Sequence, residues 1–504
     1  MSERQEARDV VMLTVKVKIT GTNGEPVPEY LLNTLYASDL HFEPDIRRSR
    51  IMPDGTVEID VTKRPYMLHC RLNIPLYGNI WVMAHNQGRG YTTDAVDFVS
   101  EALETYLYEA ERLGKGIELS VYAKGHLDAA YEYKTLSEKG IDRDYCRLKA
   151  LSHAIFAAEA ALFEASEARL ARNPRPDMLL GCNAFKYSGD NLYARYFTEL
   201  FNFATLPFYY YQVVPEEGVF DYGRRDEILE WCEKNGIKAK GHPLWFGHGG
   251  VNPKWMFGKS FDELSRFAKE FIRKTVTRYR GRIDIWDSVN EPHDWANCFE
   301  FSQEQLMEMT RICCETVRES NPDAISVINV CLPFAEYVAG KFVCYGPVFE
   351  RPVSPLTFFE RAVEKGVDFD VVGVQMYFPA RDMVAISRIL DEYARFGKPV
   401  HITEMGVPGG PARGERDNVE TAEPQSQIGL TKGVWHAPWD EHVQANWAEQ
   451  FYTMAAARPE IKALTWWDFA DPGFMKTSPF LFEDNVPREM YFRLKELKKV
   501  IMGK

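Results

Sequence analysis

The sequence predicts an α/β protein built around a (β/α)8 barrel over residues 176–504. A small β-sandwich-like domain at 1–125 and a helical connector at 126–175 are expected in front of it. From Met178 onward, apolar stretches of strand length alternate with amphipathic helical stretches over about 325 residues. Eight strand candidates occur there, and no glycine-rich phosphate loop, which a doubly wound sheet would have, is present.

The N-terminal domain is predicted from alternation of apolar and polar residues at period two. Val11–Thr20 has this pattern and is followed by the turn Gly21–Gly24. Further strands are expected at Gly55–Val61, Met67–Ile74 and Asn79–Ala84. Short strands separated by Gly, Pro and Asn are typical of a sandwich.

The connector is expected to contain one long helix. Leu148–Ala171 is rich in Ala, Glu and Leu, which are strong helix formers. The helix should end near Asn173–Pro176, because a residue before proline disfavours the helical conformation.

The barrel strands are expected at eight apolar segments. They are Leu179–Phe185, Phe203–Tyr210, Ile237–Phe246, Ile283–Pro292, Ile325–Val330, Val371–Phe378, Pro399–Val407 and Ala463–Asp471. Two of the helices between them begin with a predicted capping box, at Ser260–Glu263 and at Ser302–Gln305. A third helical pattern, through Met383 and Leu390, should stop before Gly397.

Composition and charge exclude several classes of protein. The 504 residues are 45% hydrophobic, which is enough for a large core, and 60 Lys+Arg stand against 73 Asp+Glu, a net charge of −13. This acidic balance argues against nucleic acid or an anionic membrane as partner. The absence of an apolar run near ~18 residues argues against a membrane span.

The first residues do not resemble a secretory signal, so we expect a cytoplasmic protein or a trimmed secreted one. Nine scattered cysteines favour free thiols, and the oligomeric state stays open.

Two glutamates are expected to face each other at the barrel mouth. Active sites of such barrels lie at the C-terminal ends of the strands. Glu291 ends the fourth predicted strand and Glu404 lies at the end of the seventh. A pair of carboxyl groups, one acting as acid and the other as nucleophile, is the arrangement that glycoside hydrolysis needs. We therefore expect Glu291 and Glu404 to be catalytic.

At these motifs the sequence resembles the family 10 glycoside hydrolases, a retaining xylanase family. Trp286–Pro292 (WDSVNEP) looks like the family's acid/base motif, and Ile402–Gly406 (ITEMG) like its nucleophile motif. Gly241–Phe246 (GHPLWF) is similar to the family's strand-three motif but one residue shorter, and Trp467 matches its strand-eight signature. The resemblance runs from Leu179 to about Leu497.

The resemblance implies a role for each matching residue. Glu291 would be the general acid/base and Glu404 the nucleophile, which must be ionised, so hydrogen-bond donors should point at it. Asn290 would bind the 2-hydroxyl of the sugar at the cleavage point. His242 and Gln375 would hold hydroxyls of that sugar or groups next to it, and Trp467 would lie beneath it. The resemblance implies no cofactor and no metal.

Several family positions differ in this sequence. The family's polar strand-two ligands for the neighbouring xylose are replaced by aromatic residues around Phe208 and Tyr211. The strand-six Gln-x-His is Gln375-Met376-Tyr377, and the strand-seven Glu-Leu-Asp is Glu404-Met405-Gly406. The family's His–Asp pair, which orients the nucleophile, is therefore missing as a unit. We predict that Tyr377 donates a hydrogen bond to Glu404 in its place.

Aromatic residues are abundant, with 31 Phe, 25 Tyr and 11 Trp, and several are expected at the barrel mouth. Trp245 lies at the end of the third predicted strand, and Tyr211 directly follows the second. Trp435 and Trp439 belong to a long loop, residues 408–438, that is expected to wall the cleft. Pyranose rings stack on such side chains. His293, His436 and His442 have no spacing typical of a metal site, so surface or sugar-contacting roles are expected for them.

The function predicted is a retaining glycoside hydrolase, endo-1,4-β-xylanase-like in mechanism, acting on a plant-type polysaccharide or oligosaccharide. Because the second sugar site is rebuilt, an exo-acting enzyme or one for a different backbone stays open. A non-catalytic carbohydrate-binding barrel is disfavoured by the presence of both glutamates with Asn290. For the N-terminal domain, two roles stay open: binding carbohydrate, or packing on the barrel as a structural domain.

Overall fold

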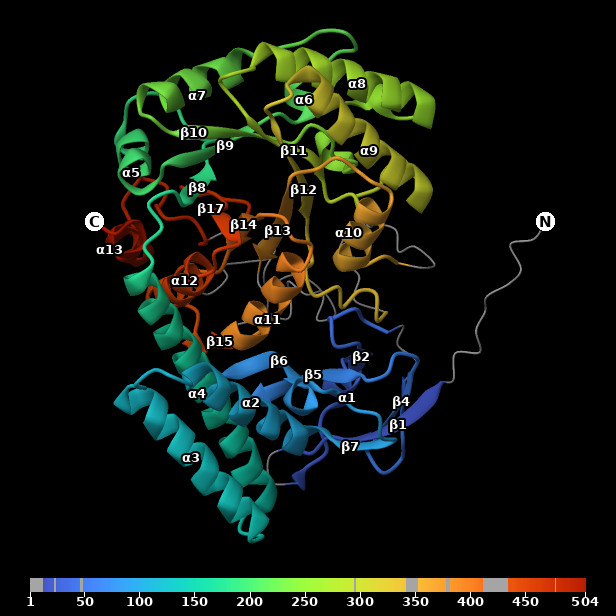
Figure 1. Cartoon of the computed structure of the whole chain (residues 1–504), viewed down its shortest axis with the longest axis vertical. Helices are drawn as coiled ribbons and strands as arrows, with labels where there is room; N and C mark the ends of the chain where they lie inside the picture. Colours follow the sequence, from blue (N-terminus) through green and yellow to red (C-terminus); the bar gives the residue numbers. More distant parts are fainter. Residues whose placement is uncertain are drawn as a thin grey trace, which may run out of the picture.

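A computed structural model describes residues 12–504 except 22–23, 46–48, 294–295, 341–351, 378–380, 411–433 and 476. Two parts are visible in Figure 1. The barrel lies at the top, and the N-terminal strands and helices, coloured blue to teal, lie below it. The long helix α4 runs along the side of both parts and leads from the lower to the upper one.

Eight parallel strands close into a barrel in the order β10-β11-β12-β13-β14-β17-β8-β9. Their bounds are β8 Leu179–Asn183, β9 Phe203–Pro207, β10 Lys238–His242, β11 Ile285–Asn290, β12 Ile325–Val330, β13 Val371–Tyr377, β14 Val400–Gly406 and β17 Ile461–Trp466. Seven of them fall within the predicted strands, and β17 overlaps its predicted strand but begins two residues earlier and ends at Trp466, so the (β/α)8 barrel is confirmed. Apolar side chains from β9, β11, β12, β13 and β17 pack together as one buried cluster: Phe203, Ile285, Val327, Val371 and Ala463.

Helices surround the barrel (Figure 1). Their bounds are α5 Leu192–Leu200, α6 Tyr210–Val213, α7 Gly223–Lys234, α8 Phe261–Arg278, α9 Gln303–Ser320, α10 Pro355–Glu364, α11 Met383–Ala394, α12 Glu441–Ala456 and α13 Glu489–Met502. Both predicted capping boxes are present, at the starts of α8 and α9. A short hairpin, β15 Val434–Trp435 and β16 Ala437–Pro438, precedes α12.

The N-terminal part contains two small sheets, ordered β3-β4-β1-β7 and β2-β5-β6. Their strands are β1 Leu13–Lys18, β2 Tyr36–Ser38, β3 Ser49–Ile51, β4 Val57–Val61, β5 Met67–Ile74, β6 Gly78–Ala84 and β7 Ala95–Asp97. The helices are α1 Glu29–Leu32, α2 Phe98–Gly114, α3 Val121–Glu138 and α4 Arg143–Arg172. The helical region thus begins at Phe98, before the expected boundary at residue 125. The predicted connector helix is part of α4.

Arg381 fixes the N-terminal part against the loop that follows β13. Its guanidinium is 1% exposed and donates to the Tyr36 hydroxyl of β2 at 2.8 Å and to Glu336 Oε1 at 2.7 Å. It also lies over the ring of Trp81 in β6, 5.3 Å from the ring centroid. Arg381 comes only four residues after Tyr377, at the end of β13. The N-terminal part therefore contacts the connection that leads away from the barrel mouth.

The long helix α4 contributes a second buried contact to this interface. The carboxylate of Glu159 accepts hydrogen bonds from the Tyr77 hydroxyl and from the backbone N–H of Met383, both at 2.8 Å. Its other oxygen lies 2.7 Å from His436 Nε2. Because a buried carboxylate is costly unless it is hydrogen-bonded, these partners tie α4 to the start of α11 and to the hairpin.

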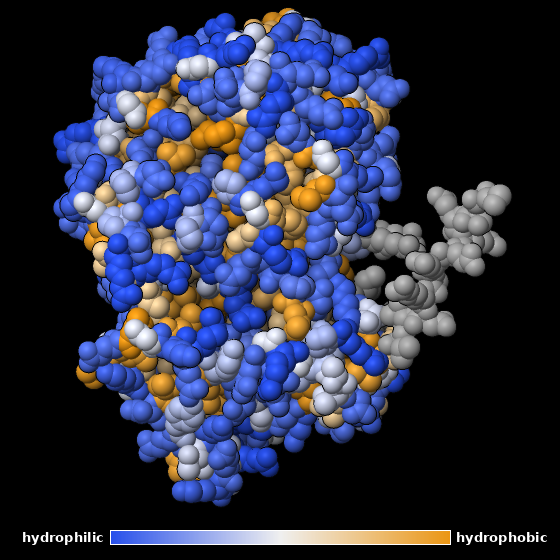
Figure 2. All heavy atoms as spheres, viewed as in Figure 1, coloured by the Kyte–Doolittle hydropathy of each residue, from blue (hydrophilic) through white to orange (hydrophobic). Residues whose placement is uncertain are grey.

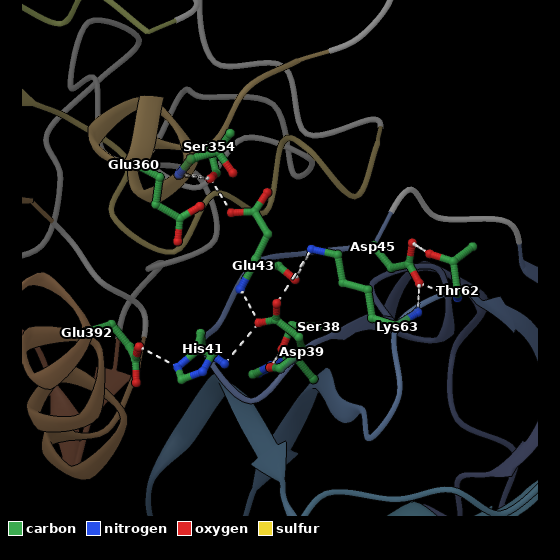
Figure 3. Close-up of polar contacts among 12 residues, drawn as sticks. Ser38, Asp39, His41, Glu43, Asp45, Thr62, Lys63, Ser354, Glu360 and Glu392 are labelled. Carbon is green, nitrogen blue, oxygen red and sulfur yellow. Dashed lines mark hydrogen bonds and ion pairs between the residues drawn. The ribbon is translucent and has the colours of Figure 1, made fainter. Parts of the chain in front are cut away.

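A third group of contacts lies nearer the surface, where a loop of the N-terminal part meets α10 and α11 (Figure 3). His41 Nδ1 is 2.9 Å from Glu392 Oε2, and Ser354, the N-cap of α10, donates to Glu43. Asp39 shapes this loop by accepting the backbone N–H groups of His41 and Glu43 at 2.9 and 3.0 Å. The N-terminal part thus contacts the barrel through both buried and exposed polar groups.

The face of the molecule drawn in Figure 2 is largely hydrophilic. On the face drawn in Figure 2, hydrophobic residues gather only in small patches between hydrophilic ones. In the part of the chain that the structure describes, none of the helices has both the length and the apolar character that crossing a bilayer requires.

Candidate active site

Glu291 and Glu404 lie together at the C-terminal ends of β11 and β14. Both are largely buried, 6% and 5% exposed. The side-chain amide of Gln375, from β13, donates to Glu291 Oε1 at 2.7 Å and to Glu404 Oε1 at 3.1 Å. Since both distances start from one nitrogen, the two oxygens are at most about 5.8 Å apart. Retaining glycosidases have carboxyl groups ~5–5.5 Å apart, whereas inverting ones need ~6.5–9.5 Å.

The backbone around Glu291 is set by its two neighbouring strands. The N–H of Glu291 donates to the carbonyl of Asn329 at 2.7 Å, and the N–H of Asn290 donates to the carbonyl of Trp245 at 2.8 Å. Glu291 itself has a φ of +51°, a left-handed conformation that non-glycine residues rarely adopt. Such conformations are found mostly where function requires a particular side-chain direction.

Glu404 is surrounded by hydrogen-bond donors. Besides Gln375, Asn329 Nδ2 donates to Oε1 at 2.9 Å and the Tyr377 hydroxyl donates to Oε2 at 2.9 Å. The hydrogen bond predicted between Tyr377 and Glu404 is therefore present. Burial nevertheless raises the pKa of Glu404 to about 7, opposed by nearby His242 and supported by the charge of Glu291. The effect of burial on the pKa of Glu404 thus outweighs that of the hydrogen-bond donors.

Gly406, at the end of β14, lies in a tightly packed position. A Cβ at Gly406 would lie 2.7 Å from Ser478 Oγ and 3.2 Å from Met475 Sδ. A larger residue therefore has no room there without a shift of these side chains. On the neighbouring strand β13, Tyr377 supplies a hydrogen bond to Glu404.

Asn329, at the end of β12, links Glu404 to Asn290. Its Nδ2 donates to Asn290 Oδ1 at 2.6 Å as well as to Glu404, while its own Oδ1 accepts from Thr403 Oγ1 at 2.5 Å. The amide orientation of Asn329 is fixed by having both a donor and an acceptor partner. Asn329 was not predicted from the sequence, although it is the only amide side chain in β12, a strand that is apolar apart from Asn329 and Ser326.

His242 is held at the end of β10 by Asp287. Its Nδ1 is 2.7 Å from Asp287 Oδ2, which also pairs with Lys240 Nζ at 2.7 Å. Although burial opposes it, Lys240 and His242 together lower the pKa of Asp287. His242 Nε2 lies 3.9 Å from Glu404 Oε1. Gly241 is required here because any Cβ would lie 2.2 Å from the ring of Trp286.

The predicted aromatic residues divide into two groups. Trp467 and Tyr211 lie at the barrel mouth: the Trp467 ring contacts that of His242, and the half-exposed Tyr211 stacks on Tyr209. Tyr209 was not predicted individually, although it belongs to the run Phe208–Tyr211. Its hydroxyl is 3.2 Å from His242 Nε2.

The other predicted tryptophans pack against further aromatic side chains. Trp245 is buried and packs on Phe299, Phe301 and Tyr210, so its side chain belongs to the core and only its carbonyl supports Asn290. Trp435 stacks on His436 at 3.9 Å, and Trp439 stacks in turn on Trp435.

The hairpin that carries Trp435 packs against the N-terminal part. The backbone N–H of His436 donates to the carbonyl of Tyr77, and its side chain reaches Glu159. These contacts place the hairpin at the interface with the N-terminal part, and the wall of the sugar cleft stays a prediction for Trp435 and Trp439. Most of the predicted loop 408–438, residues 411–433, lies outside the described residues.

The three histidines considered as metal ligands are separate. His436 contacts Glu159, His442 contacts Glu489 at 3.0 Å, and His293 lies against Cys331 and Tyr337. Burial lowers the pKa of His293 to about 3. Within the described ranges, no group of three or more His, Cys, Asp or Glu side chains is arranged to hold a metal ion.

Comparison with known proteins identifies relatives of the barrel. The family model of glycosyl hydrolase family 10 matches residues 183–496. Endo-1,4-beta-xylanase B of Thermotoga neapolitana is 25% identical over 303 residues, covering 56% of this chain and 76% of that protein. Beta-1,4-xylanase of Dictyoglomus thermophilum is 24% identical over 270 residues, covering 51% and 67%. The structure of native xylanase 10B from Thermotoga maritima has a TM-score of 0.50 at 20% identity, covering 67% of this chain and 98% of that one, a likeness of fold.

Proposed function

The chain belongs to glycosyl hydrolase family 10, and on that premise we propose that it hydrolyses β-glycosidic bonds with retention of configuration. The reaction is endo-1,4-β-xylanase-like in mechanism, a double displacement on a plant-type polysaccharide or oligosaccharide. The relatives named above are xylanases, which supports a β-1,4-linked glycan as substrate.

The observation that carries the proposal is the shared hydrogen bonding of Gln375 to both carboxylates. It keeps their nearest oxygens within about 5.8 Å. A water molecule attacking from the far side of a sugar would need a wider gap, so this spacing supports direct attack by a carboxylate.

In this mechanism Glu404 attacks the anomeric carbon while Glu291 protonates the leaving oxygen. A covalent glycosyl–enzyme forms, and Glu291 then accepts a proton from the water that hydrolyses it. Glu404 must be ionised to attack, and the donors Asn329, Gln375 and Tyr377 stabilise its charge. They also fix its orientation, which lowers the entropic cost of reaching the reactive geometry.

Three further side chains are proposed to bind the sugar at the cleavage point. The hydrogen bond from Asn329 orients the amide of Asn290 so that its NH2 group can donate to a sugar hydroxyl. The imidazole ring of His242 lies beside Glu404, and the apolar ring of Trp467 lies next to His242. No cofactor enters this chemistry.

For residues 1–175 we propose a structural role and keep the division into 1–125, 126–175 and the barrel at 176–504. The buried Arg381, held by Tyr36 and stacked on Trp81, supports this role over that of a separate carbohydrate-binding module. Ordinary linked domains share small and rather polar interfaces, whereas here a charged side chain is enclosed between the two parts.

The test is turnover of an activated aryl β-glycoside, chosen from a panel of xyloside, glucoside, galactoside and arabinoside. Glu404→Ala should reduce kcat by at least about 10⁴-fold, since the nucleophile is lost. Glu315→Ala, on the exposed face of α9, is the matched control and should leave turnover unchanged. Undiminished hydrolysis by Glu404→Ala would exclude the proposed mechanism, and failure of the wild type on every glycoside would favour a carbohydrate-binding barrel.

A further inference from the structure

Four aromatic side chains form a closed circuit beside Glu404. The ring of Phe185 is 6.0 Å from that of Tyr209, which is 5.5 Å from His242. His242 is 5.2 Å from Trp467, and Trp467 is 5.4 Å from Phe185. All four pairs meet at angles between 72° and 86°. At these separations edge-to-face rings are in van der Waals contact, so no gap remains between neighbours.

The circuit forms one continuous side of the barrel mouth. Its members come from the ends of β17, β8, β9 and β10, which are consecutive strands of the closed barrel. We call Phe185, Tyr209, His242 and Trp467 the aromatic wall. Tyr211 stacks on the outer side of Tyr209, with ring centroids 6.2 Å apart.

Hydrogen bonds make the aromatic wall rigid. The two nitrogens of His242 have partners at 2.7 Å, from Asp287, and at 3.2 Å, from the Tyr209 hydroxyl. Burial and the charges of Glu404 and Glu291 raise the pKa of Tyr209 well above its usual value, so its phenol remains a neutral hydrogen-bond partner. Neither ring can turn aside without breaking a buried hydrogen bond.

The wall is continued by the loop that follows β17. Asp468 accepts from Asn183 Nδ2 at 3.1 Å and from the backbone N–H of Phe474. Phe474 in turn packs on Tyr377, with ring centroids 5.8 Å apart. Contacts thus run without a break from Tyr209 to Tyr377, which itself binds Glu404.

The position of Glu404 decides which part of the substrate meets the wall. The nucleophile bonds to the anomeric carbon, so the sugar beside it is the one on the non-reducing side of the cleaved bond. The acid Glu291 lies on the leaving-group side. His242, in the wall, is 3.9 Å from Glu404. The wall therefore lies beside the sugar on the non-reducing side of the cleaved bond.

We propose that this site holds a single sugar ring and that the enzyme removes one terminal residue at a time from the non-reducing end of a β-linked chain. This inference rests on the proposed function and narrows it. Where the family resemblance implies polar ligands for a second sugar, this chain has Tyr209, whose ring contacts His242, and Tyr211, which stacks on Tyr209. The leaving group, on the Glu291 side, can be an oligosaccharide or an aryl group.

The test uses β-1,4-linked pentasaccharides of the sugar preferred in the aryl-glycoside panel, reduced at one end so that the two ends differ. Early products are separated by anion-exchange chromatography. Monosaccharide should exceed every other unreduced product by about tenfold or more. Early release of di- or trisaccharides from the non-reducing side would overturn the inference.

Variants of Tyr209 test whether the aromatic wall causes this product pattern. Tyr209→Ala should open the wall and raise the ratio of disaccharide to monosaccharide at least about tenfold, whereas Tyr209→Phe, which keeps the ring, should retain the wild-type pattern. Tyr222→Ala removes a half-buried ring that stacks on Phe220 elsewhere in the barrel, and it should change nothing. An unchanged product pattern in Tyr209→Ala would refute the role of the wall. Aryl-glycoside hydrolysis that depends on Glu404 would leave the proposed function standing in either case.

Discussion

Replacing Tyr377 by Phe removes one hydrogen bond from the buried Glu404 and leaves the ring in place. The hydroxyl donates to Glu404 Oε2 at 2.9 Å, and this donor lowers the pKa of a carboxylate that burial raises to about 7. Without it the pKa should rise further, because the ionised form loses a partner while the neutral form loses little.

The magnitude follows from the charge of the acceptor. A hydrogen bond to a charged group contributes about 1.5–3 kcal/mol, and one pKa unit corresponds to 1.36 kcal/mol. The pKa of Glu404 should therefore rise by about 1–2 units. Since only ionised Glu404 attacks, kcat/KM on the acid side of the profile should fall about 10- to 150-fold, and the acid limb should move to higher pH.

The assay is kcat/KM for an aryl β-glycoside measured across the pH range. Tyr452→Phe is the matched control, because its buried hydroxyl has no hydrogen-bond partner among the described residues. It should leave the profile unchanged. If Tyr377→Phe keeps both the rate and the position of the acid limb, the idea that Tyr377 stabilises ionised Glu404 is wrong.

Three further changes test other parts of the structure. The raised pKa of Glu404 means that the folded protein holds its proton more tightly than the unfolded chain, so this group's contribution to stability is lost as pH rises from 4.5 to about 7. Glu404→Gln should therefore increase the free energy of unfolding in urea by up to about 3 kcal/mol at pH 8 and by little at pH 4; an equal gain at both pH values would contradict this. Asn329→Ala removes the hydrogen bonds to Asn290 and Glu404 and should lower kcat/KM about 10- to 100-fold with the fold intact by circular dichroism; wild-type kinetics would rule out its positioning role. Tyr36→Phe removes a hydrogen bond from the enclosed Arg381 and should lower the free energy of unfolding by about 1.5–3 kcal/mol; unfolding at the wild-type urea concentration would argue against tight docking of the N-terminal part.

The barrel could be predicted from the sequence because its strands are buried on both sides and read as separate apolar runs. Two helix starts could also be predicted, since the capping boxes at Ser260 and Ser302 depend only on local hydrogen bonds. The elements of the N-terminal part were harder to predict. Helix α2, at Phe98–Gly114, carries apolar residues at helical spacing after the N-cap Asp97, but it fell inside a region assigned to strands.

Site residues could be predicted from the sequence where their position at a strand end decides the direction of the side chain, as for Glu291, Glu404 and Tyr377. Residues that act through contacts between strands could not be predicted in this way. The role of Asn329 depends on its hydrogen bonds to Asn290 and Glu404, which are far away in sequence. For Trp245, residue type alone does not decide the role. A tryptophan near a barrel mouth can stack on a sugar or pack in the core, and only its packing in the structure distinguishes the two roles.

The most direct measurement of the central claim is the site of covalent labelling. A 2-deoxy-2-fluoro β-glycoside of the preferred sugar, with a good leaving group, should inactivate the enzyme. The fluorine slows both steps of the reaction, whereas the good leaving group keeps formation of the glycosyl–enzyme faster than its hydrolysis, so that it accumulates. Mass spectrometry of the digested protein should then find one added sugar on the peptide that contains Glu404. A label on another carboxylate, or turnover of the parent glycoside with inversion and no label, would contradict a retaining mechanism with Glu404 as nucleophile.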